Sequence, residues 1–176
     1  AETLVGRTVY GDSRANPEAN NLRGKVVEVR DQAGVVTTDD FDFKGNLLSS
    51  RRQFAQSYTT TLNWSAPVAL EPETFASRTR YDALNRPIQL IAPHSDWPGA
   101  RVAVVQPMYN EANLLEQLHV WLDEVAEPAN RLDPATATLR PVADIDYNAR
   151  SQRTLMAYGN GVTTAYEYDP LTFPLR

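Results

Sequence analysis

A short turn motif recurs along this chain and constrains its fold more than any other feature. Each copy has Asp or Asn at its first position and a small or turn-prone residue at its fourth. In most copies an aromatic residue comes directly before the Asp or Asn. The copies with an aromatic are Phe41-Asp42 to Gly45, Tyr81-Asp82 to Asn85, Tyr109-Asn110 to Asn113, Tyr147-Asn148 to Ser151, and the degraded copy Tyr168-Asp169 to Thr172; the copy without one is Asp31 to Gly34.

The motif has the chemistry of a β-hairpin turn. A type I turn favours Asp or Asn at its first position, where the side chain accepts hydrogen bonds from backbone N–H groups. Its fourth position favours Gly or Asn, which tolerate a positive φ. A further hairpin is predicted at Gly159–Gly161. Stretches rich in β-formers flank the turns and predict strands at 25–30, 35–41, 47–53, 79–81, 87–91 and 154–158.

The recurrence of the motif indicates a repeated unit. A single Asp-x-x-Gly is typical of any surface turn, whereas several copies with an aromatic at a fixed offset predict successive hairpins that stabilise one another. The aromatics at 41, 81, 109, 147 and 168 are unevenly spaced, which indicates insertions between hairpins. We therefore predict a mainly β chain in which Phe41, Tyr81 and Tyr147 stack on sheet neighbours. If Tyr81 is buried in this way, Tyr81→Ala should cost about 3 kcal/mol.

Three stretches carry a resemblance to a known family. The segments "FDFKGNLLSS", "RYDALNRPIQL" and "YEYDPLTFPLR" resemble the YD repeats of Rhs-family proteins. The wider run from Asn21 to Phe173 is similar to the repeat region of insecticidal toxin-complex (Tc) B and C components. In that family YD repeats form a long β-sheet that spirals into a hollow shell around a cytotoxic C-terminal segment. The resemblance implies a structural role, with other repeat segments and a toxin cargo as partners, and a secreted or cell-surface location.

The resemblance does not imply catalysis. The C components of the family end their shell with a self-cleaving aspartate region before a variable toxin, and no such ending is found here. Neither protease nor toxin activity is therefore transferred to this chain. We expect residues 1–176 to be one repeat segment of a longer chain, without enzymatic activity and able to self-associate through open strand edges.

Residues 110–125, "NEANLLEQLHVWLDEV", fit two structures. As a helix, the segment places its Leu, Trp and Val side chains on one face, with Asn110 as the N-cap. As a strand, it places Leu118 and Leu122 on one side and His119 on the other. Periodicity favours the helix, but the hairpin motif at Tyr109-Asn110 and Asn113 favours the strand, which we predict. Residues 127–141 hold three prolines and no apolar period, so they are predicted to be a loop.

Two segments begin like calcium-binding loops but lack the later ligands. The run from Asp144 to Asn148 has Ala149 where such a loop needs glycine and Leu155 where it needs a carboxylate. The run from Asp40 to Gly45 has the glycine but carries Arg51 at the carboxylate position. We interpret both as strand ends leading into turns, and predict no metal site.

The remaining composition narrows the function classes further. The chain has no cysteine, and its two histidines, His94 and His119, have no neighbouring ligands at metal spacing. We interpret His94 as a turn residue and His119 as an exposed or half-buried strand residue. A net charge of −5 disfavours nucleic acid as a partner. No apolar run is long enough to predict a membrane span, and no motif predicts a catalytic site or cofactor.

The aromatic residues leave one alternative function open. Trp64, Trp97 and Trp121, with eight tyrosines, could form a platform that binds carbohydrate or a cell surface. The interpretation that we favour is that the repeat aromatics form ladders within the sheet and stabilise it.

Overall fold

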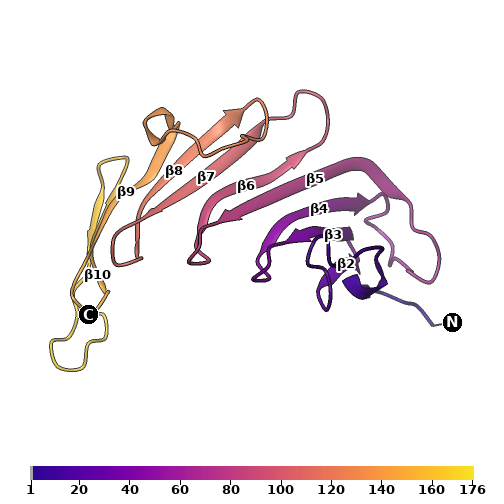
Figure 1. The fold of residues 1–176 in the computed structure, drawn as a ribbon, viewed down its shortest axis with the longest axis horizontal. Helices are drawn as coiled ribbons and strands as arrows, with labels where there is room; N and C mark the ends of the chain where they lie inside the picture. Colours follow the sequence, from indigo (N-terminus) through magenta and orange to yellow (C-terminus); the bar gives the residue numbers. More distant parts are fainter. Residues whose placement is uncertain (1) are drawn as a thin grey trace.

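The chain folds into one antiparallel sheet. The computed structural model describes residues 2–176, whose eleven strands each pair with their neighbours in sequence (Figure 1). The prediction of a mainly β chain of antiparallel hairpins is confirmed. The elements are β1 (Arg7–Tyr10), η1 (Gly11–Ser13), β2 (Val26–Asp31), β3 (Gly34–Phe41), β4 (Leu47–Ala55), β5 (Leu70–Tyr81), β6 (Pro87–Ser95), β7 (Val102–Tyr109), β8 (Leu115–Glu124), η2 (Pro134–Thr136), β9 (Leu139–Tyr147), β10 (Arg153–Tyr158) and β11 (Thr163–Ala165).

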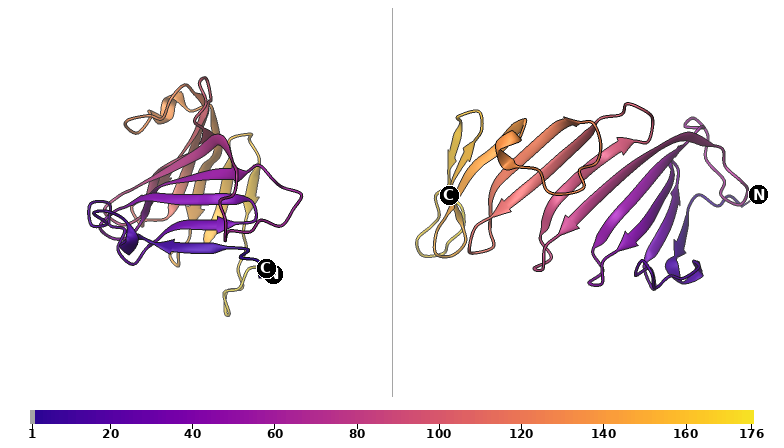
Figure 2. Two further views of the ribbon diagram at one scale, coloured as in Figure 1. Left: turned by 90° about the vertical axis from the view of Figure 1, so that its right-hand side faces the viewer. Right: turned by 45° about the horizontal axis from the view of Figure 1, so that its top comes forward.

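The sheet coils into an open arch and does not close on itself. Figure 1 and the two views of Figure 2 show the strands turning progressively from β2 to β10. Strands twist relative to their neighbours, and the twist accumulates in a sheet of this width. β1 and β11 lie at the two ends of the strand order, so each leaves one edge unpaired within the described sheet. None of the helices among residues 2–176 has the length and apolarity needed to cross a membrane.

The two margins of the sheet differ. Because successive strands alternate in direction, all repeat turns that carry the aromatic lie at one margin, which we call the turn edge (turns 42–45, 82–85, 110–113 and 148–151). The opposite margin, the loop edge, holds the connections 56–69, 96–101 and 125–138, whereas the connection 11–25 lies at the turn edge beside Phe41. The predicted insertions between hairpins therefore lie at the loop edge.

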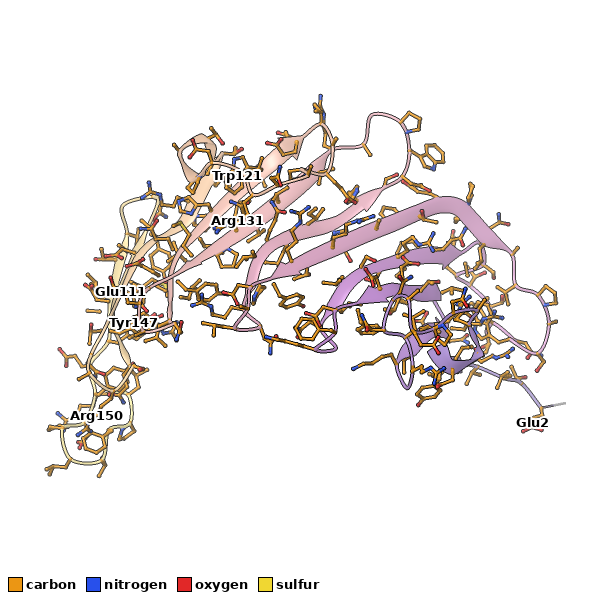
Figure 3. The ribbon with its side chains drawn as sticks, viewed as in Figure 1. Glu2, Glu111, Trp121, Arg131, Tyr147 and Arg150 are labelled. Carbon is orange, nitrogen blue, oxygen red and sulfur yellow. The ribbon has the colours of Figure 1, made fainter. Side chains whose placement is uncertain are left out.

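Two of these loops fold back over the same face of the sheet. Val35 packs under the 56–69 loop. Val35 pairs with Gln53 on β4, and Gln53 pairs with Thr74 on β5, so these three side chains lie on one face of the sheet. Arg80 lies on the same face of β5 as Thr74. Arg80 pairs with Gln89, which lies under the 125–138 loop. We call this the loop-covered face, and residues 125–138 the covering loop. Figure 3 shows that loop, with Arg131, near Trp121.

The other face is apolar and uncovered over its centre. Register aligns a row of aliphatic side chains across four neighbouring strands, and Phe54 and Phe75 make an edge-on ring contact on the same face. We call this the open face. The row consists of Leu90, Val105, Val120 and Leu139.

Two hydrophobic clusters form where the loops cover the sheet. Ala55 at the end of β4 is buried together with Leu62 and Trp64, which belong to the 56–69 loop. Ile91, Val102, Val104 and Trp121 are buried under the covering loop, with Leu132 and Ala137 packed against them. Burial of apolar area is the main favourable term in folding, so these loops contribute to the core of an otherwise single-layer sheet.

The contested segment 110–125 forms the turn 110–113 and strand β8. The prediction of a strand is therefore confirmed, and the helix alternative is wrong. The side chains of β8 alternate between two faces as predicted. The buried face is the one that carries His119 and Trp121, whereas Leu122 on the other face is exposed. The covering loop explains this, because it buries the side of β8 that carries the histidine.

The predicted loop 127–141 ends earlier than expected, because β9 begins at Leu139 and contains Pro141. The β8–β9 register is irregular here, so the missing N–H of Pro141 costs no regular ladder bond. β5 begins at Leu70 rather than at residue 79 and contains Pro72. Pro72 lies beyond the residues of β5 that pair with β6, where its missing N–H is tolerated.

The open edges of β1 and β11 lead to a testable expectation. Unpaired N–H and C=O groups at a strand edge can be satisfied by a strand from a second copy. We expect the 176-residue chain to form dimers or larger species with rising concentration in sedimentation velocity, and this association should be unaffected by chelators. Thr8→Pro in β1 removes one edge donor and should reduce the association. A chain that stays monomeric at high concentration would contradict this expectation.

Candidate functional site

Four repeat turns on the turn edge share one hydrogen-bond pattern. The N–H of the fourth residue donates to the carbonyl of the first, and the N–H of the first donates to the carbonyl of the fifth. The side-chain Oδ1 of the first residue accepts from the N–H groups of the third and fifth residues, at 2.8–3.1 Å. The fourth residue has a positive φ in every copy. The first and fourth residues are Asp42 and Gly45, Asp82 and Asn85, Asn110 and Asn113, and Asn148 and Ser151.

The residue after each turn connects one turn to the next. Asn46 Nδ2 donates to Asn85 Oδ1 at 3.0 Å, and Arg86 Nη1 donates to Asn113 Oδ1 at 2.8 Å. Gln152 Nε2 donates to the carbonyl oxygen of Phe173 at 3.0 Å. The corresponding residue after turn 110–113 is Leu114, whose side chain has no donor. A cavity of about 490 Å³ lies between turns 110–113 and 148–151 at this break, and Figure 3 labels Glu111 and Arg150 at their tips.

The aromatics before the turns act through their hydroxyl groups and through cations. Tyr109 Oη donates to the carbonyl oxygen of Pro87 at 3.0 Å, and Tyr147 Oη donates to that of Leu115 at 2.6 Å. Both bonds join one hairpin to the previous one, and burial raises the pKa of both hydroxyls. The Lys25 ammonium lies 5.4 Å from the ring centroid of Phe41.

The predicted ladder of stacked aromatics does not form in the part of the chain that the structure describes. The ring pairs there are Phe54–Phe75 and His119–Trp121, and neither includes a repeat aromatic. Tyr81 is half-buried, so the cost of about 3 kcal/mol expected for Tyr81→Ala is an upper value. Hydroxyl bonds, rather than stacked rings, connect successive hairpins.

The two outlying copies of the motif depart from the common pattern. The turn Asp31–Gly34 lies at the loop edge, between β2 and β3, and its Asp side chain accepts from the N–H of Ala33 at 2.8 Å. Asp169 caps a turn that is one residue longer. The N–H of Phe173 donates to the Asp169 carbonyl oxygen, and Phe173 has the positive φ. Tyr168 comes before this turn and pairs with Leu175 in an isolated bridge.

The turn carboxylates make folding sensitive to acid. Desolvation by itself would raise the pKa of Asp82, but hydrogen bonds from the Arg86 side chain and backbone outweigh it and hold this pKa below its usual range. The pKa of Asp42 is lowered in the same way by Asn46. Because these values are lower in the folded than in the unfolded chain, their stabilisation is present above pH of about 4 and is lost as pH falls through the folded values.

We therefore expect the urea midpoint to fall steeply below pH of about 4. Asp82→Asn keeps a side-chain oxygen for the backbone bonds but cannot titrate, so its midpoint should fall less steeply. Asp123→Asn, at the opposite end of β8 from the turns, is the control and should follow the unmodified chain. Equal slopes for all three proteins would contradict the assignment.

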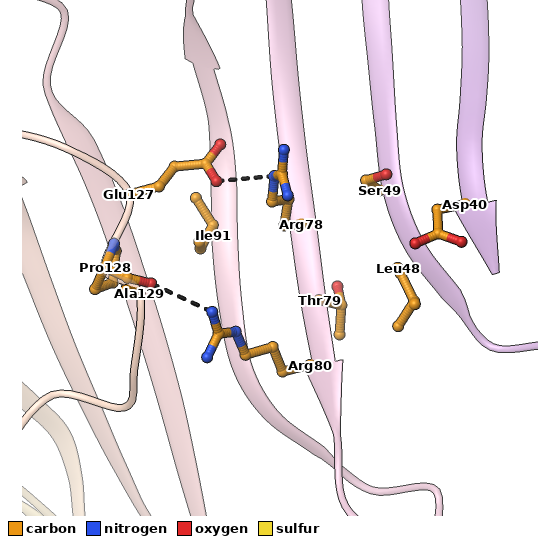
Figure 4. Close-up of a pocket in the computed structure, with 10 residues that line it drawn as sticks. All are labelled: Asp40, Leu48, Ser49, Arg78, Thr79, Arg80, Ile91, Glu127, Pro128 and Ala129. Carbon is orange, nitrogen blue, oxygen red and sulfur yellow. Dashed lines mark hydrogen bonds and ion pairs between the residues drawn. The ribbon is translucent and has the colours of Figure 1, made fainter. Parts of the chain in front are cut away.

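The covering loop is held to the sheet by charged and polar side chains at its start. Arg78 Nε lies 2.8 Å from Glu127 Oε2, and Arg80 Nη2 donates to the carbonyl oxygen of Pro128 at 3.5 Å (Figure 4). His94 Nε2 lies 3.3 Å from Glu127 Oε1. Arg78, Arg80, Glu127 and Pro128 line a cavity of about 350 Å³ between the loop and the sheet.

A row of buried polar side chains lies under the middle of the covering loop. Gln89, Gln106 and His119 occupy neighbouring positions on β6, β7 and β8 and are at most 2% exposed. Gln106 Nε2 donates to the carbonyl oxygen of Leu132 at 3.0 Å, and Gln106 Oε1 accepts from the N–H of Leu132 at 2.8 Å. Gln89 Nε2 donates to Gln106 Oε1 at 3.0 Å and to the carbonyl oxygen of Asn130 at 3.2 Å.

Both interpretations of the histidines are wrong. His94 lies in strand β6 rather than in a turn, and His119 is buried rather than exposed or half-buried. Burial lowers the pKa of His119, and the positive charge of Arg140 lowers it further. The signal that sequence reasoning missed is one polar residue inside each of three apolar runs, "PIQLI", "VVQPM" and "LHVW".

The remaining candidate residues come from several elements. Asp144 and Asp146 lie on β9 and Asn148 starts a turn. Over residues 2–176, no group of three or more histidine, cysteine, aspartate and glutamate side chains comes together in a way that could hold a metal ion. Trp64 and Trp121 are buried and donate to Asp31 and Thr136, and only Trp97 is exposed. The three tryptophans therefore do not form a common platform.

No family model matches the sequence, and no curated protein matches it. Solved structures share the fold over 98% of this chain. They include the TcdB2–TccC3 complex (21% identity, TM-score 0.75) and the Tc holotoxin pore of Photorhabdus luminescens (20% identity, TM-score 0.77). TcdB2–TccC3 without its hypervariable C-terminal region matches at 20% identity with a TM-score of 0.74. The chain spans 7–8% of the length of these matched chains. The expected Tc-like β-repeat architecture is therefore confirmed at the level of the fold.

Proposed function

We propose that this chain is a structural, non-catalytic part of the wall of a toxin-complex protein, in which the sheet encloses a polypeptide cargo. The observation that carries the proposal is the open, coiled meander of hairpins with the fold of TcdB2–TccC3. The proposal also includes other segments of the same wall as partners, and action outside the cell that makes the protein. Repeat sheets of this kind are stabilised by contacts with neighbouring units.

The two faces of the sheet are suited to different surroundings in such a wall. The loop-covered face has its own loops, ion pairs and core clusters. The open face leaves an aliphatic row across β6 to β9 without a covering loop. Apolar surface of this kind favours contact with another polypeptide over contact with water. We therefore assign the open face to the enclosed side and the loop-covered face to the outside.

The assignment can be tested by labelling single cysteines, because this segment has none of its own. Leu122→Cys places a thiol on the open face, and Ala129→Cys places one on the exposed surface of the covering loop. The reagent is a maleimide attached to a polymer of about 5 kDa, roughly the mass of the smallest protein domains, so that it is too bulky to enter a closed wall. In the isolated chain this reagent should label both thiols. In the full-length protein with other cysteines replaced, it should label Ala129→Cys alone.

The outcomes separate the possibilities. Equal labelling of both positions in the full-length protein would mean that the sheet is not part of a closed wall. Labelling of Leu122→Cys alone would keep the wall but reverse its inside and outside.

A further inference from the structure

Both histidines of the chain lie against the covering loop. His94 contacts Glu127 at the start of the loop, and His119 is buried on the strand face that the loop covers. The 56–69 loop, which covers the same face over β3 and β4, has no histidine beneath it. Histidine is the side chain whose charge changes between pH 5 and 8, so the placement of both residues at one loop couples that loop to protonation.

His119 has no partner for a second proton. Its Nδ1 is buried and lacks a hydrogen-bond partner among the described residues. The cross-strand neighbour on β7 is the neutral Gln106, and the charged group facing it from β9 is Arg140. The charged residues on the overlying part of the loop, Arg131 and Asp133, flank Leu132 and are exposed. A buried imidazolium would therefore lie near a like charge without a counter-ion, which is strongly unfavourable.

The two ends of the loop are held differently. Glu127 at the start of the loop pairs with Arg78, and its other carboxylate oxygen lies 3.3 Å from His94 Nε2. A proton on His119 favours exposure of that ring to water, which requires residues 130–137 to leave the sheet. The bonds that oppose this are those of Gln106 with Leu132, of Gln89 Nε2 with the carbonyl oxygen of Asn130, and of Trp121 Nε1 with Thr136 Oγ1.

We propose that the covering loop is a proton-operated latch: in mild acid, protonation of His119 releases residues 130–137 from the sheet while Glu127 keeps the start of the loop attached. Release would expose the buried cluster around Val104 and Trp121 on the loop-covered face. The latch depends on contacts within this chain and does not require the proposed role in a shell wall.

Two backbone amides give a matched measurement of the latch. The N–H of Leu132 in the covering loop donates to Gln106 Oε1 at 2.8 Å, and the N–H of Leu62 in the 56–69 loop donates to Gln32 Oε1 at 2.8 Å. Hydrogen exchange of both amides is measured by NMR at pH 7.5 and 5.0, and rates are corrected for the intrinsic effect of pH. If the exposed ring has an ordinary pKa of about 6.5, the protection of Leu132 should fall by up to about 30-fold at pH 5.0. The protection of Leu62 should stay nearly constant.

Variants assign the response to one ring. His119→Gln should remove the acid response of Leu132, whereas His94→Gln should retain it. A pH-independent Leu132, an equal loss of protection at Leu62, or a full acid response in His119→Gln would each overturn the proposal. If His119→Gln fails to fold, the comparison of Leu132 with Leu62 in the unmodified chain still decides.

Discussion

Trp121→Ala is expected to lower the free energy of unfolding by about 3–5 kcal/mol, the range for a buried tryptophan. Trp121 is 2% exposed and packs with Ile91, Val102 and Val104 under the covering loop. Its removal leaves a cavity between sheet and loop and also frees the Thr136 hydroxyl. Because the fold is a single sheet covered only by loops, one such cluster contributes a large part of its total stability. Urea unfolding followed by far-ultraviolet circular dichroism measures the change.

Trp97→Ala provides the matched control, because Trp97 is 57% exposed in the 96–101 loop. Its substitution should change the free energy of unfolding by less than about 0.5 kcal/mol. Equal effects of the two substitutions would show that the covering loop does not pack against Trp121 in solution.

Gly34→Ala is expected to destabilise the chain by at least about 3 kcal/mol, because two effects combine at this position. The φ of Gly34 is +137°, which side-chain-bearing residues rarely adopt. A Cβ would also lie 2.1 Å from the carbonyl oxygen of Gln53 and 2.9 Å from the N of Ala55. Since both obstacles are backbone atoms of β4, the β3–β4 pairing itself would have to shift.

Gly161→Ala separates the two effects. Gly161 has a φ of +85°, but a Cβ there would meet no atom within 4 Å. Only the backbone strain remains, so its cost should be about 1–2 kcal/mol. Urea midpoints of the two variants test the difference. A Gly34→Ala chain as stable as Gly161→Ala would mean that β3 and β4 do not approach as closely as described.

The turns could be predicted from sequence because their chemistry is local. Asp82 and Asn148 bond to N–H groups within four residues, so the residue types alone indicate the turn. The same holds for Gly159–Gly161, where the N–H of Gly161 donates to the carbonyl oxygen of Tyr158. The strand at β8 was predictable for the same reason, since turn 110–113 fixes where the strand begins.

The buried face could not be predicted, because it depends on contacts distant in sequence. Gln106 bonds to Leu132, 26 residues later, and nothing near Gln106 indicates that a loop will cover it. The burial of His119 depends on the same loop, so the strand pattern alone suggested an exposed or half-buried residue. The stacking predicted for Tyr147 failed for a related reason. Its hydroxyl bonds to the carbonyl oxygen of Leu115, 32 residues earlier, and that contact orients the ring.

The proposed function requires this sheet to be one stretch of a continuous wall. The most direct test is a cryo-electron microscopy map of the full-length protein. We expect that β1 and β11 each pair with a further strand, and that the row of Leu90, Val105 and Val120 faces an enclosed cavity. A map in which either strand edge borders solvent, or in which that row lies on the outer surface, would contradict it.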